Sequence, residues 1–217
     1  MKCFVVMPIG DQKYDNLNIS SFELKKKYND LIKESLLSVN KDLEIIRADE
    51  VVKTGSITNE IFKNIIYSDY VIVDITYPNP NVFYELGLRH ATRNKTVLIK
   101  EKNSQLVPFD ISNFRYIEYE NTASGLKTLK KEFTQIFKSF ENEPNHIDND
   151  FLKILRSIQL IINNKKEAKK KTFKAIFENQ EMIQEIISGD EDKVIELLLK
   201  SKNLDDIIDG FIDLEEI

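Results

Sequence analysis

A buried strand followed at once by a turn and a helix constrains the fold of this chain more than any other feature. Residues 70–76 (YVIVDIT) are apolar and mostly β-branched except for Asp74, which is the pattern of a strand covered on both faces. Pro78 and Pro80 cannot continue that strand. Asn81 is suited to cap the helix that follows, which carries an apolar stripe. A strand covered on both faces requires helices on both sides, so an α/β fold is expected.

The alternation of strand and helix extends over the first 140 residues. Apolar segments typical of strands occur at residues 3–9, 43–47, 70–76, 96–100 and 115–119. Helical spacing of apolar residues occurs between them, at residues 20–39, 56–68, 81–91 and 123–140. Short connections favour a mostly parallel sheet with right-handed crossovers. We therefore predict a flavodoxin-like, doubly wound, five-stranded α/β domain in residues 1–140.

The sequence changes character after residue 140. A polar, proline-containing break covers residues 141–149, and nothing after it is typical of a strand. Amphipathic helices are predicted at residues 151–162, 169–187, 192–199 and 204–214. Residues 150–217 are thus expected to form an all-helical C-terminal region. Its apolar stripes need a partner surface, which could be a second copy, the α/β domain or the other tail helices.

Composition excludes several classes of protein. A net charge of -5 argues against general affinity for nucleic acid or anionic membranes. The single cysteine, Cys3, excludes an internal disulfide and fits a reducing compartment. No segment approaches the roughly 18–20 apolar residues of a membrane span. No group of residues has metal-ligand spacing, and no P-loop or GxGxxG sequence occurs. We expect a cytoplasmic protein without metal or cofactor.

Two carboxylates are placed where an open α/β sheet binds ligands. Asp74 ends a strand and Glu85 lies in the first turn of the next helix, and these two ends share one rim of the sheet. Such a pair suits cleavage of an N-glycosidic bond, in which a carboxylate stabilises or attacks the anomeric carbon. The helix amino end would favour ionised Glu85, the candidate nucleophile. Asp74 would hold sugar hydroxyls or act as the acid. Alternatively, Asp74 caps the turn and Glu85 pairs with Arg89.

The string Asn79–Gly87 (NPNVFYELG) carries a family resemblance. Together with the preceding strand it resembles the signature of the nucleoside 2-deoxyribosyltransferase-like superfamily, including its TIR-like bacterial nucleotide-binding branch. Three further segments match in the same order, and the resemblance covers roughly residues 1–120. These segments are Met7–Gly10, Ile46–Glu50 and Val107–Ile111.

The resemblance implies that Glu85 is the nucleophile and that Asp74 engages the ribose or takes part in acid–base steps. It also implies that the loop after the first strand borders the nucleotide, although Gly10 alone fits a simple turn. Arg47 is a candidate phosphate ligand or a surface ion pair, and Gly55 begins a helix whose amides could receive an anion. The expected nucleotide-binding positions are Pro8, Ile9, Gly10, Asp11, Arg47, Gly55, Ser56 and Asn81.

The sequence therefore predicts an N-glycoside hydrolase acting on a nucleotide or a nucleotide-derived small molecule, with NAD and nucleoside monophosphates as candidates. Asn79 and Asn81 stand where deoxyribosyltransferases carry an additional Asp, and a long helical tail follows, so hydrolysis is favoured over transfer. The alternative is a non-catalytic nucleotide sensor whose tail oligomerises or relays the signal. In either case we expect a homo-oligomer with a small-molecule ligand and no nucleic-acid or membrane partner.

Overall fold

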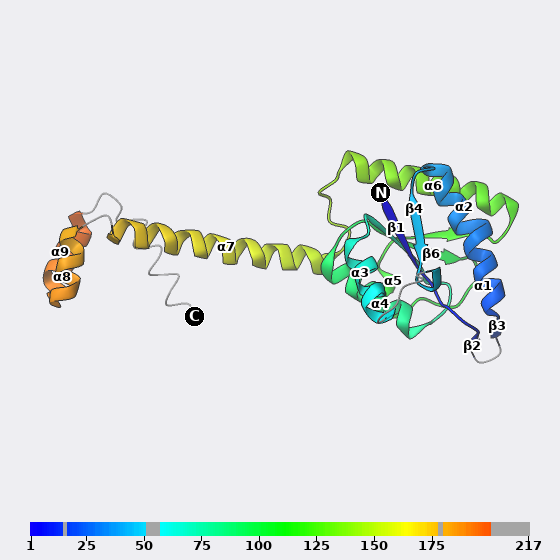
Figure 1. Cartoon of the computed structure of the whole chain (residues 1–217), viewed down its shortest axis with the longest axis horizontal. Coiled ribbons are helices and arrows are strands. Elements are labelled where there is room, and N and C mark those ends of the chain that lie inside the picture. Colours follow the sequence, from blue (N-terminus) through cyan, green and yellow to red (C-terminus); the bar gives the residue numbers. More distant parts are fainter. Residues whose placement is uncertain (15–16, 51–56, 178–179, 201–217) are drawn as a thin grey trace. The chain divides into compact units, whose positions relative to one another are not determined.

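The structure is a computed structural model that describes residues 1–14, 17–50, 57–177 and 180–200 (Figure 1). The chain divides into two compact units, Met1–Lys153 and Ile154–Ile217. The sequence placed the boundary between residues 140 and 150, whereas the structure divides the chain inside a helix that begins at Asp150. The two units are described separately.

Five parallel strands form the main sheet of the first unit. They are β1 (Lys2–Val6), β4 (Glu44–Arg47), β5 (Tyr70–Asp74), β6 (Thr96–Glu101) and β7 (Tyr116–Tyr119). Their order is β4-β1-β5-β6-β7. This is the flavodoxin-like order, in which the chain switches direction across the sheet between β1 and β5. The predicted α/β fold class, with helices following the sheet domain, is confirmed.

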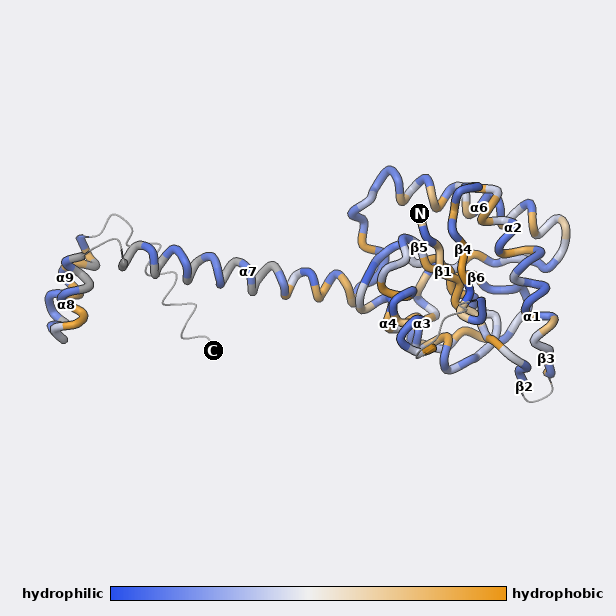
Figure 2. Tube along the Cα trace, in the orientation of Figure 1, coloured by the Kyte–Doolittle hydropathy of each residue, from blue (hydrophilic) through white to orange (hydrophobic). Residues whose placement is uncertain are grey.

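Helices cover both faces of this sheet (Figure 1). One face carries α1 (Ser21–Lys27), the π-helical segment η1 (Tyr28–Lys33), α2 (Glu34–Val39) and α6 (Ala123–Asn142). The other carries α3 (Ile57–Tyr67), α4 (Pro80–Thr92) and the short α5 (Phe109–Ser112). The apolar residues of the strands lie between these two layers (Figure 2). The expectation of a strand covered on both faces therefore holds for β5, all of whose residues are buried.

Alternation along β5 assigns its side chains to the two layers. Tyr70 and Ile72 belong to the apolar cluster that contains the α1 and α6 side chains. Val71 and Val73 belong to the cluster that contains Val82 of α4. Because successive strand residues point to opposite faces, Asp74 points to the same side as Ile72, toward α1. The alternation therefore places Asp74 on the α1 side of the sheet, whereas Glu85 belongs to α4 on the other side.

Several local boundaries differ from the sequence prediction. The first strand ends at Val6 and not at Ile9, since Pro8 has no N–H for a strand ladder. A small antiparallel hairpin, β2 (Gln12–Tyr14) and β3 (Leu17–Ile19), follows it and was not predicted. Between β4 and α3 lies a 3-10 turn, η2 (Ala48–Glu50).

The described part of the second unit is helical. A single helix, α7 (Asp150–Phe177), replaces the two predicted helices that were to meet near residue 165, because residues 163–168 (NNKKEA) contain neither Gly nor Pro. The helices α8 (Gln180–Ser188) and α9 (Glu191–Lys200) follow, separated at Gly189, whose φ of 77° favours glycine. The predicted helix at 204–214 lies outside the described residues. Of the helices described, none has the length and apolar character needed to span a membrane.

Candidate functional site

The carboxyl ends of the parallel strands define the rim on which the candidate residues lie. The loops after β1 and β5 are neighbours there, because these two strands pair directly at the switch point of the sheet. The side-chain amide of Asn79, after β5, donates to Gln12 Oε1 of the hairpin at 2.8 Å. Gln12 Nε2 donates to the carbonyl of Gly10 at 3.2 Å. Gly10 has a φ of 76°, so the turn after β1 favours glycine at this position.

The helix that carries Glu85 begins two residues earlier than the sequence suggested. Asn79, and not Asn81, is the N-cap: its Oδ1 accepts from the backbone N–H of Asn81 at 2.9 Å and of Val82 at 3.3 Å. Pro80 occupies the first helical position, where its missing N–H costs no hydrogen bond. Asn81 is exposed in the first turn. Glu85 consequently lies in the second turn of α4 and not in the first.

Glu85 is a half-buried carboxylate. Burial raises its pKa from 4.5 to about 7, which is opposite to the shift expected from the helix amino end. The electrostatic effect of a helix end fades within one turn, so desolvation dominates in the second. No residue in the described part of the chain forms a hydrogen bond or an ion pair with this carboxylate. Among the described residues, Glu85 is thus a carboxylate whose environment is set by burial and not by a bonded partner.

Arg89, one turn after Glu85, does not form the ion pair that the spacing allowed. Its guanidinium is fully buried and donates to the carbonyls of Ile65 at 2.7 Å, Ser68 at 3.0 Å and Asn94 at 2.6 Å. These carbonyls lie at the end of α3 and in the loop before β6, so Arg89 ties three segments together. The structural explanation of Glu85 as a partner of Arg89 is therefore wrong.

Asp74 is sealed inside the first unit, with no exposed surface. Its Oδ1 accepts from the backbone N–H of Thr76 at 3.0 Å and from the Thr76 hydroxyl. Its Oδ2 accepts from the Tyr119 hydroxyl at 3.0 Å. Burial raises the pKa of Asp74, while the Lys27 ammonium and these hydrogen bonds oppose part of the rise. In this conformation Asp74 holds the loop after β5 in place and does not reach solvent.

A buried lysine extends this network toward the surface. Lys27 Nζ, on α1, donates to Glu101 Oε2 at 2.5 Å and to the Tyr77 hydroxyl at 3.1 Å, and it is 6 % exposed. Burial alone would lower the Lys27 pKa, but the carboxylates of Asp74 and Glu101 outweigh it and raise that pKa. A cavity of about 450 Å³ is lined by Lys27, Tyr77 and Glu101 together with residues of β3 and α1. The network therefore opens onto a cavity beside the rim.

The structure does not combine the two candidate carboxylates into a hydrogen-bonded pair. Asp74 points toward the α1 layer, whereas Glu85 belongs to α4 in the opposite layer. No hydrogen bond joins them: Asp74 is bonded to Thr76 and Tyr119, and Glu85 has no partner among the described residues. Of the two candidate carboxylates, only Glu85 has exposed surface, whereas Asp74 is buried and holds the loop after β5.

The other expected nucleotide-binding positions have diverse environments. Pro8 is buried and Ile9 is exposed. Asp11 accepts from the backbone N–H of Ser21 at 2.7 Å, and that bond lowers its pKa. Arg47 is 2 % exposed and forms a bidentate ion pair with Asp49, with Nε–Oδ1 and Nη2–Oδ2 distances of 2.6 and 2.5 Å. Its fork of donors is thus already occupied. Gly55 and Ser56 lie outside the described residues.

Sequence reasoning missed the residues that support Asp74. Tyr119 ends β7, and its parity with Ile117 could have indicated that it points into the α1 layer. Lys27 lies three residues after Leu24, on the apolar face of α1, which is an unusual position for a lysine without a buried anion. Asn79 could have been identified as the N-cap from Pro80 after it.

Comparisons with known proteins add no further constraint. No family model matches this chain, and the search of curated proteins finds no match. Within the described residues, no group of three or more His, Cys, Asp or Glu side chains is arranged as a metal site.

Proposed function

We propose that this protein is an N-glycoside hydrolase that cleaves the bond between a base and a sugar in a nucleotide or a nucleotide-derived small molecule. The observation that carries the proposal is Glu85, a half-buried carboxylate without a described partner, whose pKa is about 7. It lies near the start of the helix after β5, close to the rim where open α/β sheets bind ligands. A carboxylate placed there can meet the sugar of a bound nucleotide.

In the proposed reaction, the ionised carboxylate of Glu85 faces the anomeric carbon of the sugar. As the C–N bond breaks, the base leaves with the bonding electron pair and takes up a proton, while positive charge develops on the sugar. Glu85 stabilises that charge or bonds to the carbon, and water then completes hydrolysis. A carboxylate of raised pKa is more basic than an ordinary glutamate, which favours bond formation with the sugar.

The likeness of residues 71–91 to the deoxyribosyltransferase-like signature supports the assignment of Glu85. In this proposal Asp74 is a positioning residue: it fixes Thr76, and with it the loop that leads from β5 to the cap of α4. NAD and nucleoside monophosphates are both candidate substrates. Arg47 does not help to choose between these two substrates, because its guanidinium is already paired with Asp49.

A nucleotide sensor without turnover is the second candidate, and one observation favours it. Asp74, the second carboxylate expected in the reaction, is completely buried and bonded on both oxygens. A protein that only binds a nucleotide needs no second acidic group at the rim. In this case the ligand would occupy the same rim, and the C-terminal helices would pass on the signal.

Mass spectrometry of small-molecule products separates the two candidates. The wild-type protein is incubated with NAD and a panel of nucleosides and nucleotides, beside Glu85→Gln and the matched control Glu44→Gln. Glu44 is an exposed glutamate at the amino end of β4, away from the carboxyl rim. We expect free base or nicotinamide from the wild type and the control, and a rate about 10²–10⁴-fold lower from Glu85→Gln.

The rate should also rise as the pH passes about 7, because only ionised Glu85 can act as the nucleophile. A panel in which no compound is cleaved, while wild type and Glu85→Gln retain the same nucleotide, would establish the sensor and refute the hydrolase. Equal turnover by Glu85→Gln and Glu44→Gln would show that another residue performs the reaction.

A further inference from the structure

The side-chain amide of Gln12, the first residue of β2, uses every hydrogen-bonding position that it has. Its Nε2 donates to the carbonyl of Ile9 at 2.9 Å and to the carbonyl of Gly10 at 3.2 Å. Its Oε1 accepts from Asn79 Nδ2 at 2.8 Å and from the Tyr14 hydroxyl at 2.8 Å. A glutamine amide offers two N–H groups and two lone pairs, so this one is fully occupied. One side chain thus joins the turn after β1 to the cap of α4.

The carbonyls of Ile9 and Gly10 fix the direction in which this amide faces. A carbonyl can only accept, so the Gln12 nitrogen must face these two groups and the Gln12 oxygen must face Asn79. Asn79 therefore presents its nitrogen to Gln12 and its oxygen to the start of α4. That oxygen accepts from two backbone N–H groups in the first turn of the helix. The turn after β1 thus sets the orientation of the cap of α4.

Hydrogen bonds fix the loop after β1 at two places in the described part of the chain. Among the described hydrogen bonds, the carbonyls of Ile9 and Gly10 accept only from Gln12. Asp11 accepts from the backbone N–H of Ser21 at 2.7 Å, at the end of the loop where the hairpin begins. The turn itself, in which Gly10 has a φ of 76°, is therefore held by the Gln12 amide.

The bond between Gln12 and Asn79 lies at the switch point of the sheet. Gln12 follows β1 and Asn79 follows β5, and these two strands pair directly where the direction of the chain across the sheet changes. Open α/β sheets bind ligands in the crevice at this point. Asn79 caps α4, and Glu85 lies about 9 Å further along the helix at a rise of about 1.5 Å per residue. The bond therefore sets the separation between the loop after β1 and the helix that carries Glu85.

We propose that Gln12 is a positioning residue of the ligand site. Through Asn79 it holds the loop after β1 and the start of α4 at one separation, so that a ligand in the crevice between them meets Glu85 in a fixed geometry. The role rests on the proposed function, because it concerns the same site. Gln12 does not act on the sugar itself, since its amide is fully engaged in contacts within the protein. Its effect on the rate comes from geometry, and a displacement of about 1 Å can cost about 10²-fold.

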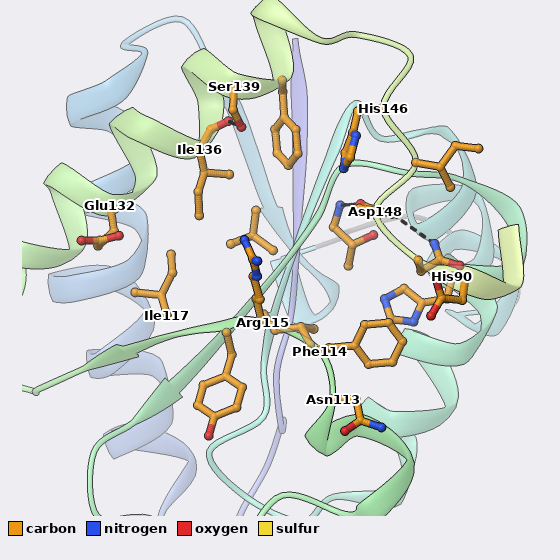
Figure 3. A pocket seen from close by; sticks show the side chains of 18 of the residues that line it. His90, Asn113, Phe114, Arg115, Ile117, Glu132, Ile136, Ser139, His146 and Asp148 are labelled. Atoms are coloured by element: carbon orange, nitrogen blue, oxygen red, sulfur yellow. Dashed lines mark hydrogen bonds between the residues drawn. The ribbon is translucent and has the colours of Figure 1, made fainter. Parts of the chain in front are cut away.

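Asn79→Asp cuts this link and keeps the cap of α4. Aspartate retains an oxygen for the first turn of the helix and is as good an N-cap as asparagine, but it has no N–H to donate to Gln12. Asn113→Asp is the matched control. Asn113 is exposed at the end of α5, shortly before the amino end of β7, and lines a cavity of about 830 Å³ along that strand (Figure 3). It lies away from the carboxyl rim and from the bond between Gln12 and Asn79.

The measurements are kcat/KM of the full chain with NAD and the nucleoside monophosphates, and the midpoint of urea unfolding. We expect kcat/KM of Asn79→Asp to fall about 10- to 100-fold while its unfolding midpoint stays at the wild-type value, because the cap remains. Asn113→Asp should match the wild type in both measurements. Equal kcat/KM for the two variants would overturn the proposal. A loss of rate that only follows a lower unfolding midpoint would also overturn it, because the bond would then serve stability alone.

Gln12→Glu tests the other end of the link if Asn79→Asp fails to fold. Glutamate keeps an acceptor for Asn79 but loses both donors to the loop after β1, so KM should rise about 10-fold or more while kcat changes less. A wild type that cleaves nothing refutes the hydrolase and not this role, and the dissociation constant of a retained NAD or nucleoside monophosphate then replaces KM. An unchanged constant for Gln12→Glu overturns the role of Gln12. A wild type that neither cleaves nor retains any of these compounds overturns both proposals.

Discussion

Arg89→Met is expected to lower the free energy of unfolding of the first unit by about 3–5 kcal/mol. Methionine preserves an apolar stem of similar length but cannot donate hydrogen bonds. The carbonyls of Ile65, Ser68 and Asn94, which Arg89 bonds at 2.6–3.0 Å, would then be buried without partners. Each unsatisfied buried acceptor costs about 1–3 kcal/mol, so three of them outweigh any gain from removing a buried charge.

Arg93→Met is the matched control for this variant. Arg93 lies one turn later, at the end of α4, and its Nη1 bonds the carbonyls of Ile66 at 3.4 Å and Tyr67 at 3.2 Å. Its side chain is 42 % exposed, so water can replace those bonds and the expected loss is below about 1 kcal/mol. All eight tyrosines lie in the first unit, and their fluorescence during urea unfolding reports on that unit alone. Equal losses for the two variants would contradict the role assigned to Arg89.

The local sequence around Arg89 could not have revealed that role. In a helix with apolar residues such as Leu86 and Leu88, an arginine at position 89 is compatible with an exposed face, an ion pair with Glu85 or a buried site. The choice depends on where the end of α3 and the loop at Asn94 come to lie, which is a matter of tertiary packing. By contrast, the alternation of apolar strands with amphipathic helices depends on local pattern and was sufficient to predict the fold class.

Asp74 illustrates the same limit at the candidate site. A strand that is apolar on both sides has no polar face, so its sequence does not indicate the layer to which Asp74 points. The structure assigns it to the α1 layer through Tyr119 and Lys27, which are far from it in sequence. The cap of α4 was different, because Asn79 and Asn81 are both suitable caps and the proline between them already favoured the first.

The hairpin and the C-terminal helices show two further reasons why the structure differs from the sequence prediction. Strands β2 and β3 are three residues each, which is too short for a periodic pattern of apolar residues to be recognised. In the tail, the polar stretch at 163–168 resembled a connection, but its residues are compatible with a helix and α7 continues through it. Hydrophobic periodicity located the helices there better than it located their ends.

Glu85→Gln is expected to stabilise the protein above neutral pH, in proportion to the burial of the carboxylate. The folded-state pKa of Glu85 is about 7, raised by desolvation above the ordinary value of 4.5. When folding raises the pKa of a carboxyl group, the protonated group contributes to the free energy of unfolding. This contribution is complete below the unfolded pKa and is lost as the pH rises through the folded pKa. The wild type therefore loses stability between about pH 4.5 and pH 7, and the neutral glutamine does not.

The expected difference between Glu85→Gln and the wild type is about 1–3 kcal/mol at pH 8, allowing for partial solvent screening, and close to zero at pH 4. Urea unfolding followed by tyrosine fluorescence at these two pH values measures it, and Glu44→Gln, an exposed site, should show no such change. A difference for Glu85→Gln that does not vary with pH would mean that the carboxylate is not desolvated. Because this measurement needs no substrate, it tests the electrostatic basis of the proposed reaction separately from the identity of the nucleotide. Perturbed pKa values cluster at functional sites, so the raised pKa of Glu85 is the electrostatic property on which the proposed reaction depends.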